Sequence, residues 1–136
     1  MTIAGFVGSS AITVAADASA KDVAASVNAA TASTGVEAAA VTKARIEATA
    51  AGTFSLSIAG DGGTATAIGS VTLVNASDLT ALKDAINAKS GTTGITAAMG
   101  ADTSEVVLTH ETGETIKFSS YASDSATKLT VSALTN

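Results

Sequence analysis

The sequence predicts an α+β fold of mostly antiparallel strands with two short helices, built from two copies of a strand–helix–strand–hairpin unit. Three observations lead to this prediction. Residues 19–38 and 77–97 each carry apolar side chains at helical spacing, followed by a Thr-Gly turn. The two segments align without a gap at an offset of 59 residues. Outside them, apolar and polar residues mostly alternate, as in strands with one buried face.

The internal repeat can be followed residue by residue. Asn28 corresponds to Asn87 and Gly35 to Gly94, 59 positions later in each case. Further identities at this offset are Thr13/Thr72, Ala29/Ala88, Thr34/Thr93, Ala38/Ala97 and Ala39/Ala98. Apolar character is kept at Ile12/Val71, Val14/Leu73, Val23/Leu82, Val27/Ile86 and Val36/Ile95. We therefore expect residues 12–39 and 71–98 to follow one backbone course of strand, helix, turn and strand.

The first copy begins with residues 2–16, which are expected to be extended. Residues 17–19 should start a helix, and residues 31–35 should connect it to a strand over residues 36–49. The apolar face of this helix consists of Ala20, Val23, Ala24 and Val27.

In the second copy the strongest strand pattern is Phe54, Leu56 and Ile58 alternating with serine. Residues 60–63, Gly-Asp-Gly-Gly, should turn the chain into a returning strand over residues 64–74.

The second helix has a clear apolar stripe at i, i+3 and i+7: Leu79, Leu82 and Ile86. Asp78 is expected to cap its start by accepting a hydrogen bond from an unpaired backbone N–H. Lys89 should lie in the last turn, and Gly91 should end the helix. Residues 93–94 then turn the chain into a strand in which Ile95, Ala97 and Met99 alternate.

The chain after this strand should remain mostly extended. Val106 and Leu108 predict a strand, with Val107 on its other face. Residues 111–114 should form a hairpin turn, after which Ile116 and Phe118 return. A polar loop from Tyr121 to Ala126 should precede a last strand with Leu129, Val131 and Ala133.

Composition excludes several classes of function. The 136 residues suffice for one domain or two small ones, and the absence of cysteine removes disulfides and thiolate chemistry. A net charge of −5 with seven scattered basic residues argues against nucleic-acid binding. No apolar run reaches the roughly 20 residues of a membrane helix, and residues 1–10 lack the features of a secretory signal. We expect neither a nucleic-acid nor a membrane partner.

The repeat resembles the flagellin hook-IN motif, named for an Ile-Asn pair that is Ile86-Asn87 in the second copy and Val27-Asn28 in the first. This motif occurs in the outer, variable domains of bacterial flagellins and in hook-associated and filament-cap proteins. The second copy covers about residues 53–120 and the first, looser copy about residues 3–49. The resemblance therefore divides the chain into units 1–51 and 52–136.

The resemblance implies a structural protein of the motility apparatus. The chain would be a surface-exposed outer domain of the D2/D3 type, forming the variable exterior of the extracellular flagellar filament. Its partners would be neighbouring flagellin outer domains, with host surfaces or antibodies as further candidates. Because the long terminal helices of a flagellin are absent, we expect an excised outer domain that begins at an expression-start Met1 and is monomeric when isolated.

Three other readings stay open. One is an outer segment of a hook-associated or filament-cap protein. Another is a surface adhesin module, which would need exposed aromatic side chains; the chain offers Phe6, Phe54, Phe118 and Tyr121. An enzyme ranks last.

The repeated polar and glycine residues have structural interpretations. Asn28 and Asn87 are expected to bond backbone groups of the loop that follows each helix. Gly35 and Gly94 are expected at turn positions with positive φ, since neither belongs to a phosphate-binding motif.

The candidates for chemistry are weak. His110, the only histidine, has Glu111 beside it and Glu114 nearby, but we expect a solvated hairpin histidine rather than a base or metal ligand. Asp61-Gly62-Gly63 has too few ligands for calcium and should be a turn. Ser9-Ser10 and Ser119-Ser120 have no evident base in the sequence.

Modification is the remaining chemical possibility. Asn75-Ala76-Ser77 is formally a glycosylation sequon, read here as a coincidence next to a helix start. The resemblance implies O-linked sugars on exposed Ser and Thr, at positions the sequence does not specify. We predict no catalytic, cofactor-binding or metal-binding residues, no cofactor, and a protein that is not an enzyme.

Overall fold

The computed structural model describes residues 1–124 and 128–134, which form two compact units. Unit 1 consists of Met1–Thr42 together with Glu111–Thr115. Unit 2 consists of Lys43–His110 together with Ile116–Asn136. Each unit has its own apolar cluster.

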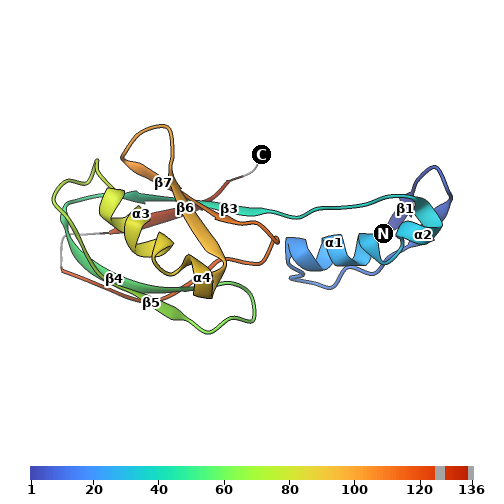
Figure 1. Cartoon of the computed structure of the whole chain (residues 1–136), viewed down its shortest axis with the longest axis horizontal. Coiled ribbons are helices and arrows are strands. Elements are labelled where there is room, and N and C mark those ends of the chain that lie inside the picture. The colour runs from blue at the N-terminus through green and yellow to red at the C-terminus, as the bar shows by residue number, and fades with distance from the viewer. Residues whose placement is uncertain (125–127, 135–136) are drawn as a thin grey trace. The chain divides into compact units, whose positions relative to one another are not determined.

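Unit 1 contains one small hairpin and two helices (Figure 1). Strands β1 (Thr2–Ala4) and β2 (Ser9–Ala11) pair antiparallel. They are followed by α1 (Ala20–Asn28) and α2 (Thr31–Thr34). A small core of Ile12, Val27 and Ala30 holds these elements together.

The start of α1 agrees with the sequence-based expectation. Ser19 caps the helix: its Oγ accepts a hydrogen bond from the Asp22 backbone N–H, and the Asp22 carboxylate accepts one from the Ser19 N–H. This reciprocal pair is a capping box, which satisfies two backbone donors that the helix leaves unpaired.

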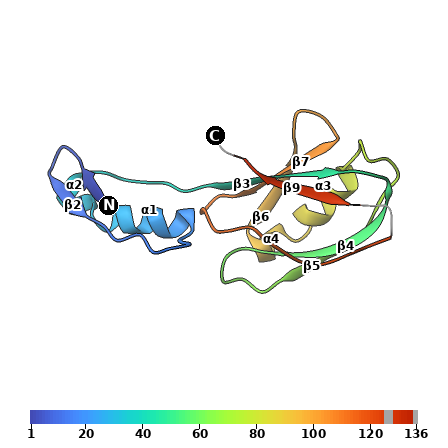
Figure 2. The ribbon, with the colours of Figure 1, turned by 180° about the vertical axis from the view of Figure 1, so that it is seen from behind.

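Unit 2 is built from two antiparallel sheets and two helices (Figure 2). One sheet has the order β6-β7-β3-β9, and the other has the order β5-β4-β8. The strands are β3 (Thr42–Ala48), β4 (Gly52–Ala59), β5 (Thr66–Leu73), β6 (Ile95–Met99), β7 (Glu105–His110), β8 (Lys117–Ser123) and β9 (Leu129–Ala133). The helices are α3 (Thr80–Asn87) and α4 (Ser90–Thr93).

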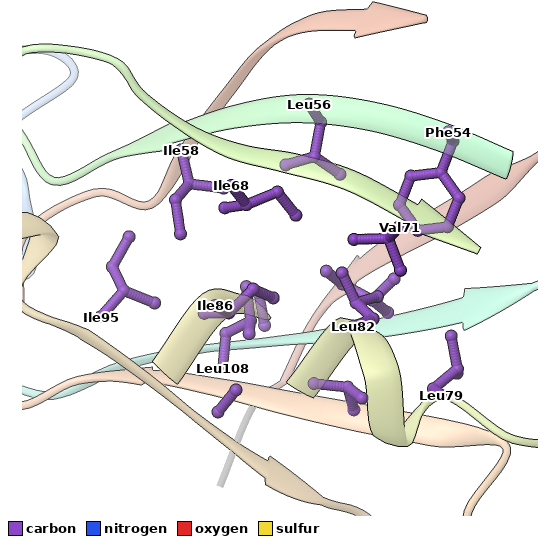
Figure 3. Packing of buried hydrophobic residues seen from close by; sticks show 14 of the residues in the cluster. Phe54, Leu56, Ile58, Ile68, Val71, Leu79, Leu82, Ile86, Ile95 and Leu108 are labelled. Atoms are coloured by element: carbon purple, nitrogen blue, oxygen red, sulfur yellow. The ribbon is translucent and has the colours of Figure 1, made fainter. Parts of the chain in front are cut away.

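The core of unit 2 lies where α3 meets the inner faces of the sheets (Figure 3). Leu79, Leu82 and Ile86 are fully buried, so the helix stripe predicted from the sequence is the packing face. Their partners include Phe54 and Val71, which extend from β4 and β5. Helix α3 contacts β5 and β6, each of which is an edge strand of its sheet.

Several predicted elements are confirmed. Residues Ser19–Ala30 and Leu79–Lys89 contain helices rather than strands. Strands β4, β5, β6, β7 and β9 occur where alternation placed them. Asp78 Oδ1 accepts a hydrogen bond from the Thr80 N–H at 3.0 Å, which is the expected contact at the start of α3, although the residue directly before the helix is Leu79.

The helices differ from the prediction in number and in where they end. The described residues form four helices, because each predicted helix is followed by one further helical turn, α2 or α4. Helix α3 ends at Asn87, so Lys89 lies beyond it. Gly91 does not end the helix but lies inside α4. The residue that ends α4 is Gly94, which adopts the left-handed conformation with φ of 69°. A residue without a Cβ adopts this conformation at little cost.

Three predictions about strands were wrong. Strand β3 begins only at Thr42, so none of residues 36–41 is in a strand, and residues 12–16 are not in a strand either. The expected course of strand, helix, turn and strand is therefore present in residues 71–98 but not in residues 12–39. Residues 111–114 do not close a hairpin: β8 pairs with β4 in the other sheet rather than with β7. The expected loop from Tyr121 begins as part of β8, which runs to Ser123, and residues 125–126 lie outside the described residues.

Among the residues that the structure describes, no helix has the length and hydropathy needed to cross a membrane.

Candidate functional site

Asn28 and Asn87 each fasten the end of a helix to the chain that returns beside it. The Asn87 Nδ2 donates to the Ala97 carbonyl at 2.8 Å, and its Oδ1 accepts from the Ala97 N–H at 2.8 Å. Asn28 makes the same two bonds to Ala38, at 2.9 Å and 2.8 Å. We call each side chain and its alanine an asparagine clamp.

The clamp imitates a β-ladder contact. A residue in an antiparallel sheet exchanges an N–H and a C=O with one partner residue, and the asparagine amide supplies the same donor and acceptor from a side chain. The backbone bonds predicted for Asn28 and Asn87 are confirmed. Their partners lie beyond the Thr-Gly turn, at Ala38 in the irregular segment before β3 and at Ala97 in β6.

A threonine and a glycine complete the turn inside each clamp. Thr93 Oγ1 donates to the Lys89 carbonyl at 3.0 Å and accepts from the Ile95 N–H at 3.2 Å. Gly94 follows in the left-handed conformation and donates from its N–H to the Ser90 carbonyl at 2.8 Å. Together these bonds satisfy backbone groups that the helix end leaves unpaired.

The first copy has the same arrangement. Thr34 Oγ1 donates to the Ala30 carbonyl at 2.9 Å and accepts from the Val36 N–H at 3.2 Å. Gly35 has φ of 71° and donates to the Thr31 carbonyl at 2.7 Å. The sequence placed Thr34 and Thr93 at a Thr-Gly turn, but the two hydrogen bonds of each hydroxyl were not predicted, although the identity of these residues at the 59-residue offset was a signal for them.

The expectation of a solvated His110 was wrong. Its side chain is only 5% exposed and lies at the end of β7, where the inward alternation of Val106 and Leu108 continues. The ring packs against Gly94: a Cβ on that glycine would lie 2.7 Å from His110 Nε2. The histidine therefore belongs to the core beside the second clamp.

The two carboxylates near His110 in the sequence, Glu111 and Glu114, form no shared site with it among the contacts that the structure describes. Glu111 is exposed. Glu114 Oε1 lies 2.7 Å from Lys21 Nζ, at the point in unit 1 where the Lys21 N–H also bonds the Gly113 carbonyl. Over residues 1–124 and 128–134, no cluster of three or more His, Asp or Glu side chains suited to a metal is found.

The remaining candidates have ordinary surroundings. Asp61 forms an ion pair with Lys117 at 2.7 Å, and Gly62 takes a φ of 74° in the turn between β4 and β5. Asn75 Oδ1 accepts from the Ser77 N–H at 2.9 Å. Ser9 and Ser10 lie in β2, and Ser119 and Ser120 lie in β8.

Asp78 has a lowered pKa. Its carboxylate accepts hydrogen bonds from the Thr80 hydroxyl and the Thr80 N–H, and both favour the charged form. A lowered pKa in the folded state means that this contribution to stability is present above the unfolded-state pKa and is lost as the pH falls. The contact at the start of α3 therefore weakens only in acid.

Comparison with known protein families identifies the family of the chain that carries these clamps. The flagellin hook IN motif matches the chain twice, over residues 1–52 and 53–112. The chain belongs to the flagellin hook IN motif family. Each matched segment contains one asparagine clamp. No curated protein matches the chain.

Membership of this family makes the chain a flagellin-type structural component. The compact units do not follow the two matched segments throughout. Strand β3 lies within the first match, 1–52, yet it occupies an inner position in a sheet of unit 2, between β7 and β9.

The burial of His110 leads to a stability prediction. His110→Ala should lower the free energy of unfolding by about 2 kcal/mol, because a buried side chain is removed and a void opens beside Gly94. Glu111→Ala, an exposed neighbour, should change it by less than about 0.5 kcal/mol. Urea titration of both variants measures the two changes in the free energy of unfolding. Equal changes would show that the His110 side chain is not buried.

Proposed function

We propose that the chain is a surface-exposed outer segment of a bacterial flagellin, which forms part of the variable exterior of the extracellular filament. The observation that carries this proposal is the tandem match to the hook IN motif over residues 1–52 and 53–112. In this proposal the duplicated units are residues 1–51 and 52–136.

The chemistry of the chain supports a structural role. Of the side chains considered for catalysis or metal binding, His110 is buried in the core, and Asp61 and Glu114 form ion pairs with Lys117 and Lys21. The outer side of β4 and β5 carries hydroxyl groups, and Thr53 and Thr72 hydrogen-bond across the two strands at 3.0 Å. A hydroxyl-bearing, weakly charged face is compatible with water and gives other molecules few strong attachment points.

In this role each clamp keeps its unit of the exposed segment rigid. The asparagine ties the helix to the returning chain, so that loops elsewhere can vary without loss of the fold. Neighbouring flagellin outer domains are the proposed partners, and host surfaces or antibodies are the proposed external contacts. At micromolar concentration we expect the isolated chain to sediment as a monomer.

Labelling of intact filaments tests the proposed location. Because the chain has no cysteine, Val74→Cys introduces a single thiol at a side chain that is 92% exposed. In a flagellin that carries this chain, we expect a maleimide dye to label Val74→Cys along the whole filament. Ile86→Cys, at a fully buried position, is the matched control and should react only after denaturation.

Two results would contradict the proposal. Labelling of Val74→Cys only after the filament is depolymerised would place the chain inside the filament. Labelling confined to the hook or the filament tip would favour a hook-associated or filament-cap protein.

A further inference from the structure

A glycosylation sequon lies on the surface of unit 2, in the connection between β5 and α3. It consists of Asn75, Ala76 and Ser77, and its middle residue is not proline, as the sequon requires. Asn75 and Ser77 are both exposed, and Val74 before them is 92% exposed. Asparagine-linked sugars are bulky groups that occur on surface loops. The position of the sequon in the fold is therefore compatible with modification.

The backbone of this loop is held in one conformation. The Asn75 carbonyl accepts a hydrogen bond from the Asp78 N–H at 3.1 Å, and the Asn75 Oδ1 accepts one from the Ser77 N–H at 2.9 Å. Thr103 Oγ1 donates to the Ser77 carbonyl at 2.8 Å, and the Thr103 carbonyl accepts from the Leu79 N–H at 2.8 Å. The loop therefore presents the sequon side chains from an ordered backbone.

The start of α3 does not account for the two polar residues of the sequon. The side chain that accepts the hydrogen bond at the helix start is Asp78. At the 59-residue offset, Asn75 corresponds to Ala16 and Ser77 corresponds to Ala18, and α1 begins in the first copy without the two polar side chains. The helix of the repeated unit therefore forms without a sequon, which leaves Asn75 and Ser77 open to another role.

Asn75 differs from the clamp asparagines in the atoms of its amide that are engaged. The Asn87 amide uses both of them, because its Nδ2 donates to Ala97 and its Oδ1 accepts from Ala97. Among the contacts that the structure describes, Asn75 uses only its Oδ1. Its Nδ2, which is the atom that carries the sugar in asparagine-linked glycosylation, is not tied to a backbone carbonyl as the Nδ2 of Asn87 is.

We propose that Asn75 is a site of asparagine-linked glycosylation. The substrate is a sugar activated at C1 by a phosphate ester, which a glycosyltransferase supplies as a nucleotide sugar or as a lipid-linked sugar. The Asn75 Nδ2 forms a bond to C1, while the bond between C1 and the phosphate oxygen breaks and leaves its electron pair on the phosphate. One amide proton passes to a base of the transferase, so that the product is a sugar-bearing secondary amide.

Ser77 directs the transferase to this asparagine. The hydroxyl two residues after Asn75 distinguishes the sequon from the other two Asn-Ala sequences, in which Asn28 is followed by Ala29-Ala30 and Asn87 by Ala88-Lys89. The Ser77 side chain is exposed and precedes α3, so a transferase can contact it without unfolding the helix. The folded chain is therefore a possible substrate.

Mass spectrometry of the full protein, purified from the cells that make it, tests the proposal. We expect the peptide that contains the sequon to carry a sugar, and electron-transfer fragmentation to place the sugar on Asn75. Asn75→Gln and Ser77→Ala should each lose it, whereas Ser77→Thr should keep it because the sequon is preserved. Ser77→Ala retains the backbone N–H that bonds the Asn75 Oδ1, so its loss would report the missing hydroxyl rather than a changed turn.

A matched control comes from the second clamp. Lys89→Ser turns residues 87–89 into Asn-Ala-Ser, the same three residues as the sequon at positions 75–77. We expect Asn75 to carry the sugar in this variant and Asn87 to remain unmodified, because the Asn87 amide is bonded to Ala97. Sugar on Asn87 at equal occupancy would contradict the selection of Asn75 by its unengaged Nδ2.

Incubating the isolated chain with fractions of the same cells identifies the donor. Transfer to Asn75 by the soluble fraction with nucleotide sugars indicates a nucleotide donor, and transfer that needs the membrane fraction indicates a lipid-linked donor.

Three results would overturn the proposal. They are an unmodified Asn75 in the protein from the cells, a sugar on Asn75 that persists in Ser77→Ala, and a sugar on the Ser77 hydroxyl instead. The mass of the purified protein does not depend on where the chain lies in the flagellum. The proposed modification and the proposed filament location can therefore fail separately.

Discussion

Replacing Leu82 with alanine should lower the free energy of unfolding by about 2–5 kcal/mol. Leu82 is fully buried in the middle of the apolar stripe of α3, between Leu79 and Ile86. Removing its side chain takes away contacts with the sheets and leaves a void that the surrounding strands cannot close.

The corresponding change in the first copy provides an internal comparison. Val23 occupies the position of Leu82 in α1, but it is smaller and only partly buried, and the apolar cluster of its unit is much smaller than that of unit 2. Val23→Ala should therefore destabilise less than Leu82→Ala. Denaturant titrations of both variants measure the difference, and small, equal losses would show that α3 does not pack as described.

Gly94→Ala should be comparably damaging, for a different reason. Gly94 has φ of 69°, and an L-residue in this region costs about 1–2 kcal/mol. In addition, the new Cβ would lie 2.7 Å from His110 Nε2, and overpacking of this kind costs typically about 1–3 kcal/mol. Thermal and urea unfolding should register the sum of the two effects.

Gly62 separates these two contributions. It has a similar φ of 74°, but no atom lies within 4 Å of the place its Cβ would take. Gly62→Ala should show only the conformational cost. In a His110→Ala background, Gly94→Ala should then fall to the cost of Gly62→Ala, because the collision is gone. An unchanged cost in that background would mean that His110 does not pack on Gly94.

Much of the local structure was predictable from periodicity. Leu79, Leu82 and Ile86 have a spacing that only a helix brings to one face, and they are the buried face of α3. Phe54, Leu56 and Ile58 likewise identify the inner face of β4. Local patterns predict which side of an element is buried because burial acts on each side chain separately.

Pairing between distant strands was not predictable in this way. Strand β8 pairs with β4 rather than with its neighbour β7, and β3 lies between β7 and β9. The alternation in β8 is compatible with either sheet, so the choice depends on long-range packing. The helical turn of α4 does not follow from the sequence pattern, because either Gly91 or Gly94 could end the helix and only Gly94 adopts positive φ.

His110 shows how a local signal can be misread. The phase that buries Val106 and Leu108 continues to residue 110, so the sequence contained the evidence for its burial. The expected turn at residues 111–114 led to a surface assignment instead. The asparagine clamps were predicted correctly as backbone contacts because the amide has both a donor and an acceptor and the helix end leaves backbone groups unpaired.

The central claim is that both hook IN motifs are held by the same clamp, from Asn28 to Ala38 and from Asn87 to Ala97. NMR couplings across hydrogen bonds test it most directly, because they connect a backbone amide nitrogen to the side-chain carbonyl that accepts its proton. We predict a coupling from the Ala97 N–H to the Asn87 side chain and an equivalent one from the Ala38 N–H to the Asn28 side chain. A coupling in the second motif alone, or in neither, would contradict the claim that one structural unit is repeated.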